Sequence, residues 1–179
     1  SFKSLIERGV FEIEEVLKYG IDISEGEDFT LNEYQEKALS QIKEAFETNT
    51  TALLHGVTGS GKTLIYIQLI KETIAKGKQV LYLVPEIALT TQLAERLKVM
   101  IGEELFVYHS RFSNRERLTT WMRLLDSANN EIIIGARSSL FLPLNNMGLI
   151  IVDEEHESSF KQHESSPHYN ARDASIWLA

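Results

Sequence analysis

The stretch that decides the fold is Thr51-Ala52-Leu53-Leu54-His55-Gly56-Val57-Thr58-Gly59-Ser60-Gly61-Lys62-Thr63. Its apolar start predicts a buried strand, and the run from Gly56 to Thr63 fits the pattern G-x-x-x-x-G-K-[ST] of a P-loop. Glycines let backbone N–H groups turn toward phosphate oxygens, and a helix that follows adds its unpaired N-terminal amides. A chance glycine-rich turn is the alternative, but it does not explain the strand before the loop and the helix after it.

The residues of this loop have distinct expected roles in binding ATP and Mg²⁺. The backbone around the phosphates would be formed by Gly56, Thr58, Gly59, Ser60 and Gly61. Lys62 would reach the β- and γ-phosphates and take part in catalysis, and the hydroxyl of Thr63 would bind Mg²⁺.

An acidic stretch follows a second apolar run, residues 149–152. Because ligands gather at the carboxyl ends of parallel strands, we expect Asp153 to hold Mg²⁺ through water and Glu154 to orient or deprotonate the attacking water. A solvated acidic loop or the first turn of a helix is the alternative, and the P-loop upstream favours the catalytic interpretation. His156 has no histidine or cysteine partner at the spacing of a zinc site.

A glutamine lies upstream of the P-loop, at the start of a predicted helix. Thr30 or Asn32 is a plausible N-cap for this helix. The side-chain amide of Gln35 has both donors and an acceptor, which match the edge of adenine. A single glutamine on a helix is more often a surface residue, but the position just ahead of the P-loop favours adenine binding.

Short apolar runs alternate with amphipathic stretches along the chain. Runs typical of buried strands occupy residues 51–55, 79–84, 105–109, 131–135 and 148–153. Helical spacing of apolar residues marks residues 39–46 and 64–70, and further helices are expected over 89–101 and 114–128. Since parallel neighbours need crossover connections, this order predicts an α/β fold, a three-layer α/β/α sandwich around a parallel sheet.

The composition is that of a globular chain, with 179 residues of which 43% are hydrophobic and 25% charged. There is no cysteine, which excludes disulfides and thiolate metal sites here and permits a reducing cytoplasm. No apolar run approaches the ~18 residues of a membrane span. The net charge of −8 would repel a nucleic-acid backbone, so a DNA role needs specific motifs or basic domains elsewhere.

The two ends of the chain suggest a piece of a longer protein. Residues 1–28 do not join the alternation of strands and helices, and we expect them to be the tail of a preceding domain and its linker. The chain begins without Met and stops inside a helix-like stretch, residues 171–178. Residues 29–179 are expected to form the main lobe.

Several segments together resemble the superfamily 2 helicases, and among them the family of primosomal replication-restart DNA helicases. The resemblance rests on residues 56–63, 84–92, 109–110, 135–141, 153–161 and 169–173, with Gln35 ahead of them. These segments run in order from about residue 29 to the end. The resemblance implies that residues 29–179 are the first motor lobe, a RecA-like P-loop NTPase lobe, and that residues 1–28 end a winged-helix-like domain.

The resemblance also implies that two loops contact the DNA backbone. In that family the segment 85–92 faces the DNA strand, and Thr90 and Thr91 would offer hydroxyls and amides to phosphates. Within residues 135–141, Arg137 and Ser138 are the expected contacts. Ala136 stands where the family usually has a threonine, which removes one possible hydroxyl contact. Ordinary capping of the loops is the alternative for these residues.

An aromatic and basic segment after the acidic stretch resembles the family's aromatic-rich loop. Phe160 and Tyr169 would stack on unpaired bases and pass that contact on to Glu154 nearby. Packing of Phe160 in the core is the alternative.

The resemblance implies ATP-driven 3′→5′ unwinding of forked or single-stranded DNA in replication restart, in the cytoplasm and away from membranes. Other primosome proteins and a single-stranded DNA-binding protein are the implied partners, and zinc is expected in the full-length family with its ligands outside this chain. Two other functions stay open. The chain could be a P-loop ATPase that acts on RNA or protein, or a docking module for DNA or partners with residual nucleotide binding. No residue pattern predicts an oligomeric state.

Overall fold

The computed structural model describes residues 30–49, 51–57, 59–102, 105–109, 112–126, 131–163 and 166–179. Residues 1–28, where the sequence predicts the tail of a preceding domain, lie outside this part of the chain, and so does Thr58 of the P-loop.

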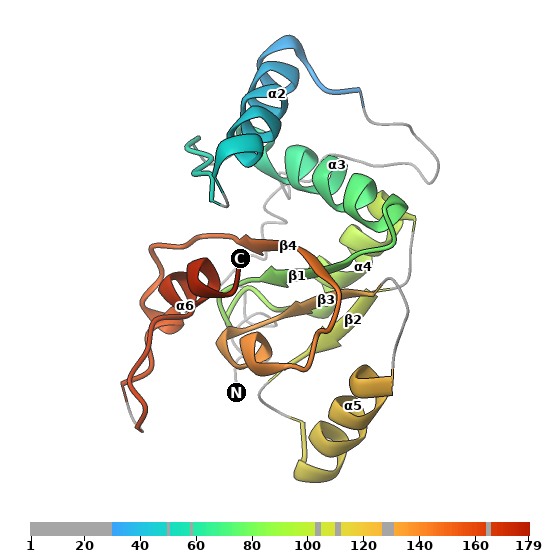
Figure 1. The fold of residues 1–179 in the computed structure, drawn as a ribbon, viewed down its shortest axis with the longest axis vertical. Helices are drawn as coiled ribbons and strands as arrows, with labels where there is room; N and C mark the ends of the chain where they lie inside the picture. The colour runs from blue at the N-terminus through green and yellow to red at the C-terminus, as the bar shows by residue number, and fades with distance from the viewer. Residues whose placement is uncertain are drawn as a thin grey trace, which may run out of the picture.

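The centre of the structure is a parallel sheet in the order β2-β3-β1-β4 (Figure 1). Its strands are β1 (Gln79–Leu83), β2 (Leu105–Tyr108), β3 (Ile132–Gly135) and β4 (Met147–Val152). Every pairing between them is parallel. The parallel sheet expected from the sequence is therefore confirmed, with four of the five predicted strands present.

Helices cover both faces of this sheet. They are α2 (Glu33–Thr48), α3 (Lys62–Ala75), α4 (Thr91–Ile101), α5 (Asn114–Asp126) and α6 (Ala171–Leu178), with short 3₁₀ helices η1 (Arg137–Phe141) and η2 (Ser158–Phe160). Within the described residues, no helix is long and apolar enough to span a bilayer.

Successive residues of β1 point to opposite sides, as the period of a strand requires. Val80 and Tyr82 pack with residues of α3 and α4 in one core. Leu81 and Leu83 belong to a second core with Leu124 of α5, residues of η1 and η2, and Ala171 of α6. Because β1 is buried on both sides, the three-layer α/β/α sandwich is confirmed.

Helix α2 begins with a capping box that fixes the residues nearest the P-loop. Asn32 Oδ1 accepts a hydrogen bond from Gln35 N at 3.0 Å, and Gln35 Oε1 accepts one from Asn32 N at 2.9 Å. Asn32, and not Thr30, is thus the N-cap. Leu39 and Ile42 of α2 pack against Ile65 and Leu69 of α3.

The prediction that residues 51–55 form a strand of the sheet is wrong. Residues 51–57 lie outside any strand ladder, although their exposure alternates with period two. Ala52 and Leu54 pack beside Leu149 of β4, whereas Leu53 is 76% exposed. The segment packs with one face beside β4, the edge strand of the sheet, and its other face is exposed. Its apolar composition predicts a strand buried on both faces. In the described part of the chain, the segment packs on one face without forming backbone hydrogen bonds to β4.

Candidate functional site

The P-loop joins the extended segment 51–57 to α3 through two glycines in the left-handed region. Gly59 has φ +80° and Gly61 has φ +82°, which favour glycine because a side chain is strained there. Gly61 is the N-cap of α3 and provides no side chain to cap it. The first amides of α3 are therefore available to an anion, as a phosphate site requires.

Lys62 folds back over the loop that it follows. Its Nζ donates to the carbonyl oxygens of Gly56 at 2.7 Å and Val57 at 3.4 Å. These contacts hold the ammonium group inside the loop. A phosphate is a stronger partner for this cation than a neutral carbonyl, because both partners are then charged.

Gln35 lies directly against the P-loop. Its Nε2 donates to Ser60 O at 3.3 Å, and a Cβ added to Gly61 would clash with the same nitrogen. The side chain is only 9% exposed, and its oxygen is used in the capping box. Adenine binding by Gln35 stays a prediction, and it would require the amide to exchange these protein partners for the base.

The acidic turn begins one residue after β4. The N–H of Asp153 donates to Leu83 O of β1 at 2.9 Å, which extends the pairing of the two strands by one step. Asp153 Oδ2 accepts a hydrogen bond from the hydroxyl of Tyr82 at 2.9 Å, and Oδ1 accepts one from Glu154 N at 3.1 Å. The orientation of this carboxylate is thus set by both strands.

Two tyrosines border Asp153 on the side of α3. Tyr82 and Tyr66 meet edge to face, with ring centroids 5.9 Å apart. Burial raises the pKa of Tyr82 well above its usual value, and the negative charge of Asp153 raises it further. Burial also raises the pKa of Tyr66, followed by the charges of Asp153, Glu155 and Glu154. Both hydroxyls are therefore neutral hydrogen-bond donors at ordinary pH.

Glu154 has a backbone conformation that is rare outside glycine. Its φ is +53°, the single positive value for a non-glycine residue in the described part of the chain. Such positions cost on the order of 1–3 kcal/mol and cluster at functional sites. The side chain is exposed, and its Oε2 lies 3.7 Å from His156 Nε2. The turn therefore presents Glu154 to solvent at the end of the sheet.

The residues present fit ATP with Mg²⁺. Thr63 stands in the first turn of α3 and Asp153 follows β4, and the two elements are in contact. Mg²⁺ commonly takes one or two protein ligands and completes its shell with water and phosphates. Within the described residues no group of three or more histidines or acidic side chains could hold a metal ion by itself. A site shared between protein and nucleotide is the arrangement these residues suit.

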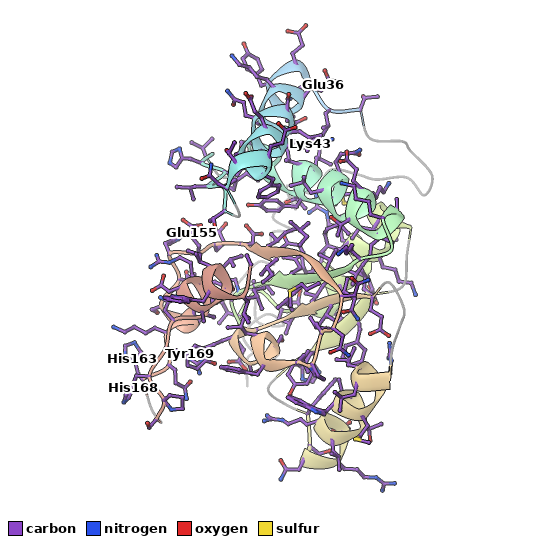
Figure 2. All side chains as sticks on the ribbon, in the orientation of Figure 1. Glu36, Lys43, Glu155, His163, His168 and Tyr169 are labelled. Carbon is purple, nitrogen blue, oxygen red and sulfur yellow. The ribbon has the colours of Figure 1, made fainter. Side chains whose placement is uncertain are left out.

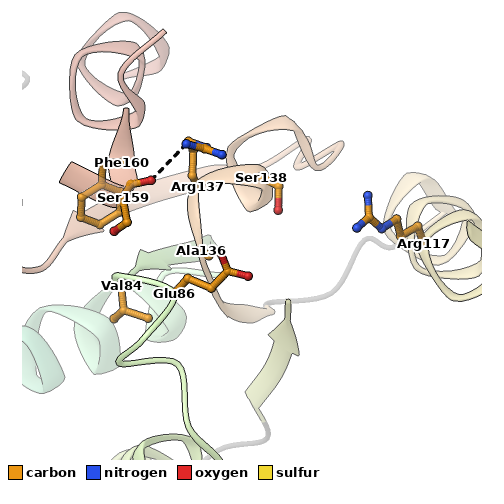
Figure 3. A pocket seen from close by; sticks show the side chains of 8 residues that line it. All are labelled: Val84, Glu86, Arg117, Ala136, Arg137, Ser138, Ser159 and Phe160. Atoms are coloured by element: carbon orange, nitrogen blue, oxygen red, sulfur yellow. Dashed lines mark hydrogen bonds between the residues drawn. The ribbon is translucent and has the colours of Figure 1, made fainter. Parts of the chain in front are cut away.

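A second surface lies beside the nucleotide site, at the ends of β1 and β3. A pocket of about 110 Å³ lies there. Figure 3 shows its lining side chains, which come from the loop that follows β1, from η1 and the residue before it, from η2 and from α5. The pocket is lined by Val84, Glu86, Arg117, Ala136, Arg137, Ser138, Ser159 and Phe160. The pocket thus brings together Glu86, from the first segment that the resemblance assigns to DNA, and Ala136, Arg137 and Ser138, from the second. Thr90 and Thr91 do not line it. Arg117 was not predicted, because an arginine in a charged helix carries no signal in the sequence.

Two expected DNA contacts already have partners in the protein. Arg137 Nη1 donates to the carbonyl oxygens of Ser159 at 3.2 Å and Lys161 at 2.6 Å. Thr90 is the N-cap of α4, and its Oγ1 accepts a hydrogen bond from Leu93 N at 3.2 Å. Thr91 is exposed and Ser138 is half-buried at the pocket. Capping therefore accounts for Thr90, while Ser138 and Thr91 lie at the surface.

The prediction that Phe160 stacks on bases is wrong for this conformation. Its side chain is 1% exposed and packs with Leu81, Leu83 and Leu140 in the second core. A ring that lies among these side chains has no face left for a base. The alternative of core packing holds, because η2 turns Phe160 inward.

Tyr169 lies in a loop that projects from the body of the structure with His163 and His168 (Figure 2). The loop is closed by an antiparallel bridge between Lys161 and Asn170. Tyr169 is half-buried and meets Phe141 edge to face at 5.1 Å. Burial raises the pKa of its hydroxyl, against the effect of Arg137. The aromatic surface at this loop is thus formed by Tyr169 and the exposed Phe141.

The parallel sheet, the P-loop and the acidic turn define a P-loop NTPase lobe. Residues 28–178 match the family described as "Type III restriction enzyme, res subunit". The chain belongs to this family.

Three relatives share the name "Replication restart protein PriA". The protein of Bacillus subtilis (strain 168) is 40% identical over 98% of this chain and 22% of its own length. That of Haemophilus influenzae is 50% identical over 84% of this chain and 20% of its own length. That of Synechocystis is 52% identical over 67% of this chain and 14% of its own length. The chain thus spans about a fifth or less of these relatives.

A solved structure has the same fold. It is the "ATP-dependent Type ISP restriction-modification enzyme LlaBIII bound to DNA", with a TM-score of 0.55 and 20% sequence identity. The match covers 85% of this chain and 12% of that enzyme. At this identity the likeness extends to the α/β fold alone.

We expect Gly61→Ala to cost more stability than Gly59→Ala. Both changes force a side chain into the left-handed region, at about 1–2 kcal/mol each. Space around Gly59 is open, whereas a Cβ at Gly61 displaces the Gln35 amide and its hydrogen bond to Ser60, which adds about 0.5–1.5 kcal/mol. Urea unfolding of both variants measures the difference. Equal losses would show that Gln35 does not brace the loop.

Phe160→Ala should lower the free energy of unfolding by about 3–5 kcal/mol, because it leaves a cavity in the second core. Tyr169→Ala is the matched control, and a smaller loss is expected since that ring is half-buried. Thermal and urea unfolding compare the two. A loss for Phe160→Ala no larger than that of the control would contradict the buried position.

Proposed function

We propose that this chain is the ATP-binding first motor lobe of a DNA helicase that acts in replication restart and primosome assembly. One observation carries the proposal. A P-loop helix and an acidic turn meet at one end of a parallel sheet, in a chain 40–52% identical to the PriA proteins of three bacteria.

The roles of the nucleotide-site residues follow from their chemistry. The amides of Gly59, Ser60 and Gly61 and the first turn of α3 bind phosphates, and Lys62 leaves its carbonyl partners to contact the β- and γ-phosphates. Thr63 and Asp153 would hold Mg²⁺, which would offset negative charge on the phosphates during transfer of the γ-phosphoryl group.

Two further residues complete the nucleotide site. Glu154 accepts a proton from the attacking water or orients it. Gln35 recognises adenine. The exposed carboxylate of Glu154 supports the first role. The position of Gln35 beside the P-loop supports the second, in which its amide exchanges its protein partners for the base.

The pocket between β1, η1 and η2 is the proposed DNA-backbone contact. Hydroxyls and amides bind phosphates without a high positive charge, so the net charge of −8 does not exclude this surface. Ser138 offers a hydroxyl at the pocket and Arg137 adds a cation there. Thr91, exposed at the start of α4 and outside the pocket lining, offers a further hydroxyl. Tyr169 and Phe141 form the aromatic surface on which unpaired bases could stack.

The whole protein is proposed to unwind forked DNA in the 3′→5′ direction in the cytoplasm, with primosome proteins and a single-stranded DNA-binding protein as partners. A second motor lobe would contribute the arginine that stabilises the transition state, and zinc ligands would lie outside this chain. Forked duplexes with tails of opposite polarity test the direction, since only one of them should be unwound.

Lys62→Ala should weaken binding of a fluorescent ATP analogue by roughly ten- to a hundredfold, because it removes a charge-assisted contact of about 1.5–3 kcal/mol. Glu154→Gln is the matched variant. It should leave this affinity unchanged and stop hydrolysis in the two-lobe protein, since an amide cannot accept the proton. Fluorescence titration and single-turnover phosphate release measure the two effects. Unchanged affinity of Lys62→Ala for the analogue would show that the P-loop is not the nucleotide site.

This lobe alone should bind ATP with Mg²⁺ but hydrolyse it about 10³–10⁵ times more slowly than the two-lobe protein, because an arginine finger is worth that factor. It should unwind nothing, since stepping needs two lobes that close and open around ATP. Phosphate release with single-stranded oligonucleotide and unwinding of a forked duplex compare the two proteins. Comparable activity from the single lobe would refute the two-lobe proposal.

The same assay includes a control for the DNA surface. In the two-lobe protein, Ser138→Asp puts a carboxylate at the proposed phosphate contact and should lower stimulation by DNA. Ser40→Asp makes the same change on the exposed face of α2 and should not. Equal stimulation of the two variants would argue that the pocket does not bind DNA.

A further inference from the structure

A buried tyrosine on β1 donates a hydrogen bond to Asp153, the expected magnesium ligand. Tyr82 is 1% exposed, and its hydroxyl donates to Asp153 Oδ2 at 2.9 Å. No motif contains Tyr82, and nothing in the sequence joins it to a residue 71 positions away. The contact arises because Tyr82 pairs with Ile151 of β4, two residues before Asp153.

We propose that Tyr82 is a positioning residue for Asp153, which it holds in the orientation that binds the Mg²⁺ of the ATP complex. This inference rests on the proposed function. Tyr82 itself touches neither metal nor nucleotide in this role. It acts through the carboxylate, as the residues behind metal ligands commonly do.

The hydrogen bonds of Asp153 define what the tyrosine contributes. An ionised carboxylate has about four lone-pair positions. Tyr82 uses one on Oδ2 and Glu154 N uses one on Oδ1. Tyr66 also forms a side-chain hydrogen bond with this carboxylate, and the remaining capacity is free for metal-bound water. The backbone of Asp153 is already fixed by its hydrogen bond to Leu83 O. The tyrosine therefore restricts the rotation of the Asp153 side chain, which the backbone hydrogen bond leaves free.

The surroundings of Tyr82 make it a rigid support. Its ring lies in the core between the sheet and α3, with Ile67, Ile70 and Ile134 in the same core. Tyr66 meets it edge to face, and Tyr66 stands about one turn after Lys62 in α3. One packed pair of rings thus connects the P-loop helix to the acidic turn. A shift of α3 when phosphates bind would be passed to Asp153 through these rings.

A purely structural contact is the competing explanation, in which Asp153 merely satisfies a buried hydroxyl. The two explanations differ in what Tyr82→Phe changes. Loss of a structural hydrogen bond lowers stability alone. Loss of positioning raises the Mg²⁺ concentration needed for nucleotide binding and leaves Mg²⁺-free binding unaltered.

The test measures binding of a fluorescent, non-hydrolysable ATP analogue to the 179-residue chain over a series of MgCl₂ concentrations and in EDTA. For Tyr82→Phe we expect the half-saturating Mg²⁺ concentration to rise about tenfold, the lower end of the effect of outer-shell residues, because the metal is held through water. The affinity in EDTA should stay within about twofold of the parent, which also shows that the site is folded.

Two further variants make the result specific. Tyr108→Phe removes another buried tyrosine hydroxyl, on β2, and should leave the half-saturating Mg²⁺ concentration unchanged. In an Asp153→Asn background, Tyr82→Phe should have no additional effect, because the two residues act as one unit.

Two outcomes overturn the proposal while the nucleotide site stands. One is a half-saturating Mg²⁺ concentration within about twofold of the parent in Tyr82→Phe. The other is a rise in the half-saturating Mg²⁺ concentration that Tyr82→Phe causes equally in the parent and in the Asp153→Asn background. If the parent chain itself shows no Mg²⁺-dependent binding of the analogue, the proposed function fails and this inference fails with it.

Discussion

The pairing of β1 with β4 is the interaction on which the rest of the structure depends. Both strands lie between layers of helices, and β1 is buried along its whole length. Their ladder continues one step beyond β4, through the hydrogen bond from Asp153 N to Leu83 O. That step fixes where the acidic turn starts, and it puts Asp153 over Tyr82. With another register, Asp153 would not lie next to Tyr82, which packs against the P-loop helix α3.

The same sheet separates two kinds of surface. On the side of α3 the P-loop and the acidic turn offer amides, a lysine and carboxylates, which suit a nucleotide with its metal. At the ends of β1 and β3, the pocket with Arg137 and Ser138 offers groups that suit a phosphate backbone. Both surfaces lie at the carboxyl ends of parallel strands, where loops meet and side chains are not needed for the core. Glu154 follows β4 at the same end of the sheet, in a turn with positive φ.

The pattern of apolar residues predicted strands correctly where a segment is buried on two faces, and wrongly where a segment packs on one face. The runs that became β1, β3 and β4 were recognised because apolar residues filled nearly every position. Residues 51–55 were similarly apolar, yet the side chains alternate between half-buried and exposed, and the segment lies outside the ladder. Phe160 shows the same limit, since an aromatic residue in a polar loop can stack on a ligand or turn into the core, and the turn of η2 decided for the core.

The sequence by itself determined the class of fold, and it carries the motifs from which the chemistry of the site is proposed. The P-loop is local, because its glycines and the start of α3 are consecutive in the chain, and its function depends on backbone conformations that neighbouring residues set. The alternation of strands and helices likewise determined a parallel sheet covered on both faces. Only the tertiary structure decided which distant side chains serve this site. Tyr82 reaches Asp153, Gln35 reaches Ser60 and Arg137 reaches the carbonyl of Ser159 in η2, across 71, 25 and 22 positions of the chain. These contacts depend on strand register and helix packing, which many residues fix together and no short motif encodes.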